Sequence, residues 1–240
     1  PTHANFTVRY YDDNGRIQIG THSCTADEYT FRSTKVPAAK PETQLWALND
    51  YISKVSFELK STNFPGSFTT TYANTWSNID KDLLQSSGFG ANLKRSGWFK
   101  DMVSVGESSL GRASEILNLV KGKVKWNDKN SLYSYNLKEA LNKGVGSSSD
   151  LNFLLINALN AAGMEAYPII LSTRGNGRLP ISHPSASGFN YVIVALRLDN
   201  NMYFTDAASK YGSWNILPEK CMVESARLLS ENHKDWIDLT

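Results

Sequence analysis

Three consecutive serines stand at the start of a predicted helix, between a glycine and an aspartate: Gly146, Ser147, Ser148, Ser149 and Asp150. A nucleophile there gains from unpaired amide hydrogens and the positive helix-dipole end, which can hold an oxyanion. A cysteine gains the most reactivity there, because this environment lowers the pKa of its thiol. A serine can also simply cap the helix, and Ser147 and Asp150 have the spacing of a capping-box variant. For Ser148 we therefore weigh helix-start structure, a ligand contact and a nucleophile.

The elements that must position these serines are predicted from periodicity. Apolar residues recur every three to four positions over 151–162, which predicts a helix with a broad apolar stripe, central to the core. Earlier helices are expected around 76–84, 110–120 and 137–143. After the serine-containing helix, apolar runs predict buried strands over 166–171, 191–198 and 202–205.

The first part of the chain has the two-residue period of β-strands. Apolar and polar residues alternate over 6–10 and again over 17–19, with a turn signal at 12–15 between them, which predicts a hairpin. The same alternation over 55–59 predicts a further strand.

The period changes from two to nearly four after about residue 73. We therefore expect a β-rich segment over 1–72, the end of a β-sandwich domain, and a second domain over 73–240. In the second domain helices come first and strands follow, so its fold class is α+β.

The composition is that of a globular protein. The 240 residues, 41% hydrophobic and 20% charged, can bury a sizeable core. A net charge of +2, with no basic run longer than Lys94-Arg95, provides no electrostatic footprint for nucleic acid. No stretch approaches the roughly 20 apolar residues of a transmembrane helix. Because the chain starts Pro1-Thr2, without methionine or an apolar signal core, we expect a processed piece of a longer protein.

Two cysteines, Cys24 and Cys221, are too few for a disulfide framework. Neither pairs with a histidine at metal-ligand spacing, so we expect no metal site and no cofactor. One disulfide and two free thiols both stay open, and we favour free thiols because lone cysteines tend to be buried as small hydrophobes.

The helix that follows the serines resembles one in a known family, the transglutaminase-like superfamily, which shares the papain-like cysteine peptidase fold. The family has a glycine, one residue, the catalytic cysteine, and then a helix with paired leucines that ends in Ala-Ala-Gly. Here Gly146, Leu154-Leu155 and Ala161-Ala162-Gly163 match. The resemblance covers about residues 107–210 and implies a core of helices packed on an antiparallel sheet. The β-rich start looks like the β-sandwich region that precedes this core in multidomain exported bacterial proteins.

The resemblance also places the family's catalytic positions on this chain. Ser148 takes the place of the cysteine, and Tyr191, in "FNYVI", takes the place of the histidine. Asp206, in "TDA", keeps the place of the aspartate. Two of the three catalytic positions have therefore changed.

These replacements argue against catalysis. A serine must lose its proton to a base as it attacks, and a tyrosine with a pKa of about 10 is almost wholly protonated at neutral pH. For Tyr191 we weigh a ring packed in the core, a binding contact and a catalytic acid or base. Asp206 is either a retained aspartate bonded to Tyr191 or a turn acid after a strand.

Other side chains offer further ligand candidates. His183 is the only histidine within the family-like core, and its glycine- and proline-containing neighbourhood predicts a solvated loop. Aromatic residues are numerous enough to stack on sugars or peptides, although they are also common core fillers. Tyr133, Tyr135 and Trp214 are the best candidates to face outward, because their neighbours are polar or glycine.

We therefore expect a catalytically silent transglutaminase-like domain. Its role would be to bind a peptide or glycan in the cleft between Ser148 and Tyr191, or to act as a scaffold beside the flanking domains of an exported bacterial protein. Two alternatives stay open. One is an active amidohydrolase or peptidase that uses Ser148 as nucleophile with help from His183 or another base. The other is a folding unit whose cleft is filled by its own side chains.

Overall fold

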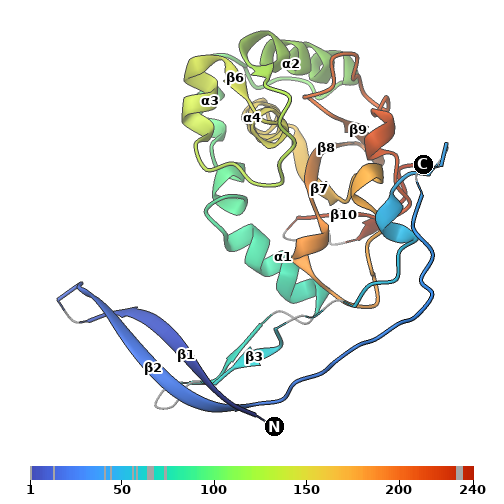
Figure 1. Cartoon of the computed structure of the whole chain (residues 1–240). Coiled ribbons are helices and arrows are strands. Elements are labelled where there is room, and N and C mark those ends of the chain that lie inside the picture. Colours follow the sequence, from blue (N-terminus) through green and yellow to red (C-terminus); the bar gives the residue numbers. More distant parts are fainter. Residues whose placement is uncertain are drawn as a thin grey trace. The chain divides into compact units, whose positions relative to one another are not determined.

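The computed structural model describes residues 2–12, 14–40, 42–43, 45–55, 57, 59–63, 68–72, 75–230 and 235–240. The chain divides into two compact units, residues 1–39 and 40–240 (Figure 1). The second unit contains the expected α+β elements and all the candidate site residues.

The first unit is a long hairpin. Strand β1, Thr2–Tyr11, pairs antiparallel with β2, Ile17–Ala26. At the turn between them Asp12 Oδ1 accepts hydrogen bonds from the backbone N–H groups of Asn14 and Arg16. Gly15 adopts a φ of +72°, which a glycine tolerates well. The predicted hairpin is confirmed.

The start of the second unit differs from the predicted strand over 55–59. Val55, Phe57 and Leu59 lie in irregular backbone, and their neighbours Ser56 and Glu58 fall outside the described residues. Regular pairing begins later, between β3, Ser61–Thr62, and β4, Thr70–Thr71. The strand prediction is therefore wrong for the described positions. Alternation shows only that one face could be buried, and a strand also needs a neighbour that continues the ladder.

The predicted helices are confirmed. They are α1, Trp76–Gln85; α2, Leu110–Lys123; α3, Leu137–Lys143; and α4, Ser148–Ala161. Side-chain hydroxyls cap the first two, since Thr75 accepts from the N–H of Asn78 and Ser109 accepts from that of Arg112. Short 3₁₀ turns connect the elements, at Leu48–Asp50, Gly90–Leu93, Ser96–Phe99, Arg174–Asn176, Ala186–Gly188 and Glu219–Cys221.

A five-stranded antiparallel sheet in the order β11-β10-β7-β8-β9 forms the other half of the fold. The predicted strands are present as β7, Glu165–Leu171; β8, Tyr191–Leu198; and β9, Asn201–Thr205. Two short strands were not predicted: β10, Ala226–Leu228, and β11, Trp236–Ile237. A separate parallel bridge joins β5, Lys125–Trp126, to β6, Val145–Gly146, just before α4.

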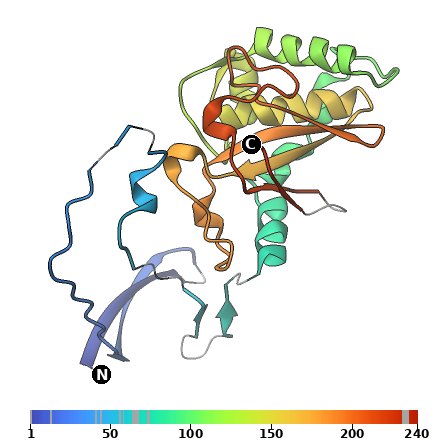
Figure 2. The ribbon, with the colours of Figure 1, turned by 90° about the vertical axis from the view of Figure 1, so that its right-hand side faces the viewer.

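Helix α4 lies between the sheet and α2, and it is central to the core (Figure 2). Its residues from Leu151 to Leu159 are all buried, so the helix is enclosed on every side. Strand β8 is buried on both faces: Val192, Val194 and Leu196 pack in the cluster that contains α4, and Ile193 and Ala195 pack in a second cluster behind the sheet. Burial on both faces explains the continuous apolar run of this strand.

A buried ion pair ties α1 to β10. The guanidinium of Arg227 donates two hydrogen bonds to the carboxylate of Asp80, each 2.6 Å long. Trp76 and Trp236 lie against the same guanidinium, with ring centroids 5.7 and 5.1 Å from its central carbon. The two-pronged geometry satisfies both buried charges, which holds this end of the sheet against α1.

The fold is a mixed helix-and-sheet fold with antiparallel strands, so the predicted α+β class is confirmed. The compact units divide before residue 40, whereas the period of the sequence changes near residue 73. The contacts within residues 1–72 do not test whether this segment is the end of a β-sandwich domain. The division into a β-rich segment over 1–72 and a domain over 73–240 therefore stays a prediction.

Candidate functional site

The start of α4 is built by the capping box that the serine spacing predicts. The side chain of Ser147 accepts from the backbone N–H of Asp150 at 3.3 Å, and Asp150 Oδ2 accepts from the N–H of Ser147 at 2.7 Å. Ser134 also donates a hydrogen bond to Asp150. Gly146 has no space for a side chain, because a Cβ there would lie 2.9 Å from that of Asp150. Ser147 and Asp150 thus serve the helix start.

Ser148, which the resemblance places at the family's cysteine, is fully buried. Its hydroxyl accepts from the N–H of Ser131 at 3.0 Å and donates to the carbonyl of the same residue at 3.4 Å. Its own N–H donates to the carbonyl of Lys129 at 3.0 Å. The loop before α3 therefore occupies both the hydroxyl and one of the helix-start amides.

Tyr191 and Asp206 are brought together by neighbouring strands, since Tyr191 heads β8 and Asp206 directly follows β9. The Tyr191 hydroxyl donates to Asp206 Oδ2 at 3.0 Å. The other carboxylate oxygen accepts from Asn152 Nδ2 and from the N–H of Ala208, both at 2.9 Å. Both side chains are fully buried. Asp206 is thus bonded to Tyr191, and its other oxygen also accepts a hydrogen bond within the turn that follows β9, so both alternatives for its role stay open.

The phenol of Tyr191 is held in its protonated form. Burial raises the pKa of Tyr191 well above its ordinary value of 10.0, and the charge of Asp206 raises it further. An interaction with the Ser148 side chain lowers this pKa, but it is the smallest of the contributions. A phenol with a raised pKa cannot accept the proton of a serine at neutral pH.

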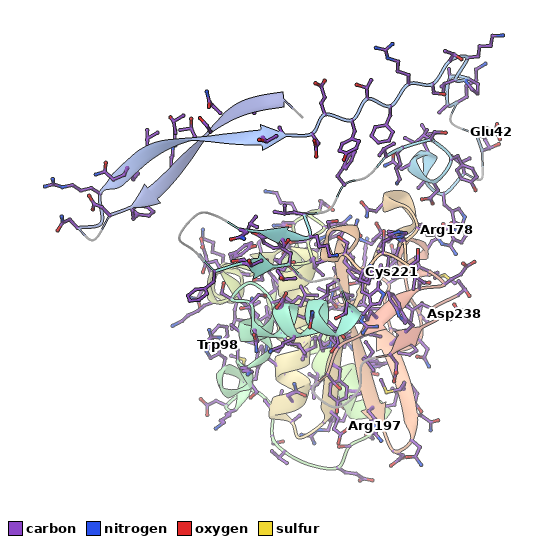
Figure 3. The ribbon with its side chains drawn as sticks, turned by 90° about the horizontal axis from the view of Figure 1, so that it is seen from below. Glu42, Trp98, Arg178, Arg197, Cys221 and Asp238 are labelled. Carbon is purple, nitrogen blue, oxygen red and sulfur yellow. The ribbon has the colours of Figure 1, made fainter. Side chains whose placement is uncertain are left out.

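Cys221, which is labelled in Figure 3, belongs to the same site as Tyr191 and Asp206, although sequence reasoning missed it. The thiol is free and fully buried, and it packs in one apolar cluster with Tyr191. Burial raises the pKa of Cys221, and the nearby charge of Asp206 acts in the same direction. The thiol is therefore neutral and inaccessible, unlike the reactive thiolate of a cysteine nucleophile. The side chain of Cys24 lies outside the described part of the chain.

Lys220 covers the site from the solvent side. Its ammonium lies 4.4 Å from the centre of the Tyr191 ring and 4.7 Å from the ring of Trp126. It also donates a hydrogen bond of 3.0 Å to Asn130 Oδ1. Five cavities among the described residues are lined by side chains other than Ser148, Tyr191 and Asp206. The three positions that the family would use thus meet, but in a closed place.

His183 is placed as the sequence predicts, on an exposed loop. Its Nδ1 forms a hydrogen bond of 2.9 Å with the hydroxyl of the neighbouring Ser182. The hydroxyl of Ser148 is bonded instead to the backbone of Ser131. The structure does not bring this imidazole to the serine.

The prediction that Trp214 faces outward is wrong. Only 7% of its surface is exposed, and it packs in the core cluster that contains α4. Ser213 and Ile216 pair in a tight turn, and Asn215 has a φ of +60°, so the polar neighbours face solvent while the indole turns inward. Tyr135 is 82% exposed as predicted, and its ring stacks on the half-buried Tyr133 with centroids 6.2 Å apart.

Two further properties concern the described residues as a whole. They contain no group of three or more His, Cys, Asp or Glu side chains placed to hold a metal ion. Among the helices of the described part, none is both long and apolar enough to cross a membrane.

The sequence matches no family model and no curated protein. The similar solved structures include the following two. A candidate protease from Parabacteroides distasonis is 14% identical, with a TM-score of 0.45, and the match covers 99% of this chain and 42% of that one. A candidate cysteine protease from Cytophaga hutchinsonii is 15% identical, with a TM-score of 0.36, and the match covers 67% of this chain and 46% of that one. The matched regions span less than half of either structure's length.

Proposed function

We propose that this chain carries a transglutaminase-like domain that is catalytically silent and acts as a binding or scaffolding module of a longer, exported bacterial protein. The proposal has three parts: the family, the loss of catalysis and the remaining role. Each is supported by a different feature of the molecule.

The family is supported by where three side chains meet. Ser148 begins the central helix, Tyr191 begins the strand that pairs with β7, and Asp206 follows the next strand. These are the places that the resemblance assigns to cysteine, histidine and aspartate. Their convergence, with a hydrogen bond between the last two, is what the arrangement of a former triad would leave behind.

The loss of catalysis rests on one observation, which is the set of partners of the Ser148 hydroxyl. This hydroxyl bonds to the backbone of Ser131, and its ionisable neighbour is Tyr191, whose pKa is raised. An attack by serine requires a base that takes its proton as the bond forms. Neither group can do so, and the buried hydroxyl is also closed to a substrate.

The remaining role is binding or scaffolding away from this cluster. Lys220, Trp126 and the loop through Ser131 occupy the space where a ligand would contact Ser148. The cluster then stabilises the fold, while other surfaces of the domain make the contacts with a ligand or with flanking domains.

The loss of catalysis is tested with amide substrates. The purified chain and Ser148→Ala are incubated with a fluorogenic peptide library and with a glutamine donor and amine acceptor pair. We expect no turnover above the buffer rate for either protein. Turnover by the unchanged chain that disappears in Ser148→Ala would establish the active-hydrolase alternative instead.

The family assignment is tested by restoring the former triad. The double variant Ser148→Cys with Tyr191→His is made together with Lys220→Ala, which opens the cover, in a background where Cys24 and Cys221 are serine. We expect iodoacetamide to alkylate the thiol introduced at position 148 faster than it alkylates glutathione at the same pH, because a neighbouring imidazole favours the thiolate. The matched control keeps Tyr191 and carries the other changes. Equal alkylation rates in the two proteins would contradict the triad arrangement.

A further inference from the structure

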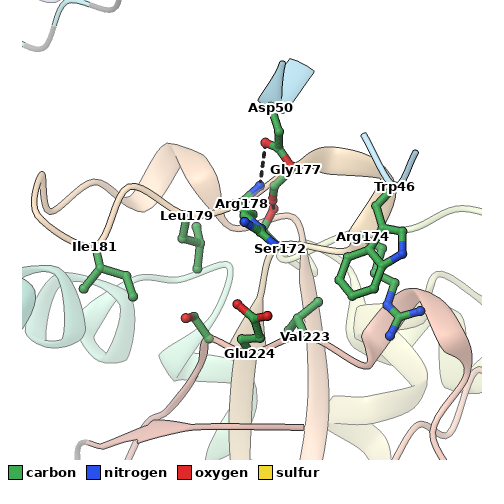
Figure 4. A pocket seen from close by; sticks show the side chains of 11 residues that line it. Trp46, Asp50, Ser172, Arg174, Gly177, Arg178, Leu179, Ile181, Val223 and Glu224 are labelled. Carbon is green, nitrogen blue, oxygen red and sulfur yellow. Dashed lines mark hydrogen bonds between the residues drawn. The ribbon is translucent and has the colours of Figure 1, made fainter. Parts of the chain in front are cut away.

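A cavity of about 200 Å³ opens at the end of β7, and its lining differs from that of the sealed cluster. It is formed by the turn that follows Leu171, by the segment before β10, and by the 3₁₀ turn at residues 48–50. Figure 4 shows Leu179 and Ile181 on one side, Trp46 and Arg174 on the other, and the carboxylate of Glu224 rising from the base. All of these residues belong to the second compact unit.

The wall of the cavity is firmly built. Ser172 donates to the carbonyl of Gly177 at 2.6 Å and accepts from Asn176 Nδ2 at 3.0 Å, which closes a tight turn. Gly177 has a φ of +103°, and a Cβ there would lie 2.6 Å from Asp50 Oδ1. The same oxygen of Asp50 accepts from the N–H of Arg178 at 2.8 Å (Figure 4). The position thus requires glycine, which lets the Asp50 carboxylate approach the backbone closely.

An aromatic wall stands at one end of the cavity. The guanidinium carbon of Arg174 lies 3.7 Å from the centre of the Trp46 ring, and Arg174 is itself held by the Met222 carbonyl at 2.7 Å and by Glu219 at 3.1 Å. The indole thus lies against a guanidinium that is itself held, and 43% of its surface stays exposed. A partly exposed indole beside Val223 provides an apolar surface that a ligand can cover.

The charges of the lining have no large excess of either sign. Two carboxylates, Asp50 and Glu224, and two guanidinium groups, Arg174 and Arg178, line the cavity, so their formal charges cancel. Within the described residues, the side chains of Glu224 and Arg178 make no hydrogen bond or ion pair, and both are exposed. The cavity therefore offers open acceptors and open donors together, beside an apolar wall.

We propose that this cavity binds a neutral sugar residue at the end of a glycan chain. Sugar hydroxyls both donate and accept hydrogen bonds, so they match Glu224 and Arg178 at once, and the C–H face of the ring packs against apolar surface. Because the charges of the lining cancel, the cavity has no net attraction for an anion or for a cation. The inference gives the proposed binding role a site and a ligand class, and it depends on that role but not on the loss of catalysis.

The test uses an array of neutral oligosaccharides ending in glucose, galactose, mannose, xylose or N-acetylglucosamine. Sialylated glycans and lysine-terminated peptides are the charged arms. The strongest neutral binder is then titrated by NMR into ¹⁵N-indole-labelled protein, with the Trp46 signal assigned by Trp46→Phe. We expect saturable shifts of the Trp46 indole and a loss of affinity of at least about tenfold in Glu224→Gln and in Arg178→Gln. Glu107→Gln, at an exposed glutamate outside the cavity, is the matched control.

Three outcomes would overturn the inference: binding of no neutral oligosaccharide, binding confined to a charged arm, or neutral binding that Glu224→Gln and Arg178→Gln leave unchanged. Glu224 and Arg178 are exposed, so their variants fold even if Trp46→Phe does not. Failure here leaves the amide-substrate assay of Ser148→Ala unaffected, so it is distinguishable from failure of the proposed loss of catalysis.

Discussion

Two regions of the second compact unit differ in how their polar side chains are bonded. One is the cluster of Ser148, Tyr191 and Asp206, and the other is the cavity beside Glu224. In the cluster the polar groups are buried and each is bonded to another part of the chain. In the cavity the carboxylate of Glu224 and the guanidinium of Arg178 stay exposed without a partner among the described residues. The polar groups of the cluster are hydrogen-bonded within the fold, whereas Glu224 and Arg178 in the cavity can still form hydrogen bonds with a ligand.

This difference bears on the proposal that the cluster is a former catalytic triad. A buried hydroxyl or carboxylate that is fully hydrogen-bonded specifies the packing around it, and removing a partner is costly. Under that proposal, the three side chains keep the places of a triad because their hydrogen bonds stabilise the fold. Ligand binding then needs groups whose hydrogen bonds are not already used within the fold.

The substitution with the largest expected effect on stability is Asp206→Ala. The change leaves the Tyr191 hydroxyl, the Ala208 N–H and one hydrogen of Asn152 without an acceptor in the core. We expect the free energy of unfolding to fall by about 3 to 5 kcal/mol, measured by urea denaturation. Asp206→Asn keeps one carbonyl oxygen for two of the three donors and is the matched control, with a smaller loss. A loss below about 1 kcal/mol in Asp206→Ala would mean that the cluster is not a stabilising part of the fold.

The pH dependence of stability reports whether the buried Tyr191 phenol is part of the folded structure's stability. Burial raises the pKa of Tyr191 above its ordinary value of 10.0, so in the folded chain it keeps a proton that the unfolded chain loses. Its contribution is complete below about pH 9 and is lost as the pH rises past 10, at up to about 1.4 kcal/mol per pH unit. In Tyr191→Phe we expect the loss of stability between pH 9 and 11 to be smaller by about 1.4 kcal/mol. Tyr211→Phe, at a tyrosine that is 80% exposed, controls for the missing hydroxyl. Parallel curves for Tyr191→Phe and the unchanged chain would contradict the raised pKa.

Local patterns in the sequence predicted the parts of the fold whose signals lie within one element. The apolar stripe of α4, the capping box of Ser147 and Asp150, and the run from Tyr191 to Leu198 each depend on neighbours a few residues away. The strand predicted over 55–59 failed because alternation describes one segment alone, whereas a strand also needs a neighbour that continues the ladder.

The parts of the site that escaped prediction are created by contacts between distant segments. Cys221 and Lys220 reach Tyr191 from a short 3₁₀ turn, and nothing in their own spacing marks them as part of the site. Trp214 was misjudged because its polar neighbours belong to a turn that points the indole inward. The cavity at Glu224 combines residues from three segments, and only the folded chain places Trp46 beside them.

The smallest expected effect tests the other half of the comparison. If the cavity groups are unused by the fold, Glu224→Gln and Arg178→Gln should each change the free energy of unfolding by no more than about 0.5 kcal/mol, because both side chains are exposed and make no hydrogen bond within the described residues. Urea denaturation with and without a saturating glycan measures both properties. The ligand should stabilise the unchanged chain through its preference for the folded state, and it should stabilise these variants less at the same concentration. A variant that loses more than about 2 kcal/mol without ligand would show that its side chain supports the fold, and the contrast with the cluster would then disappear.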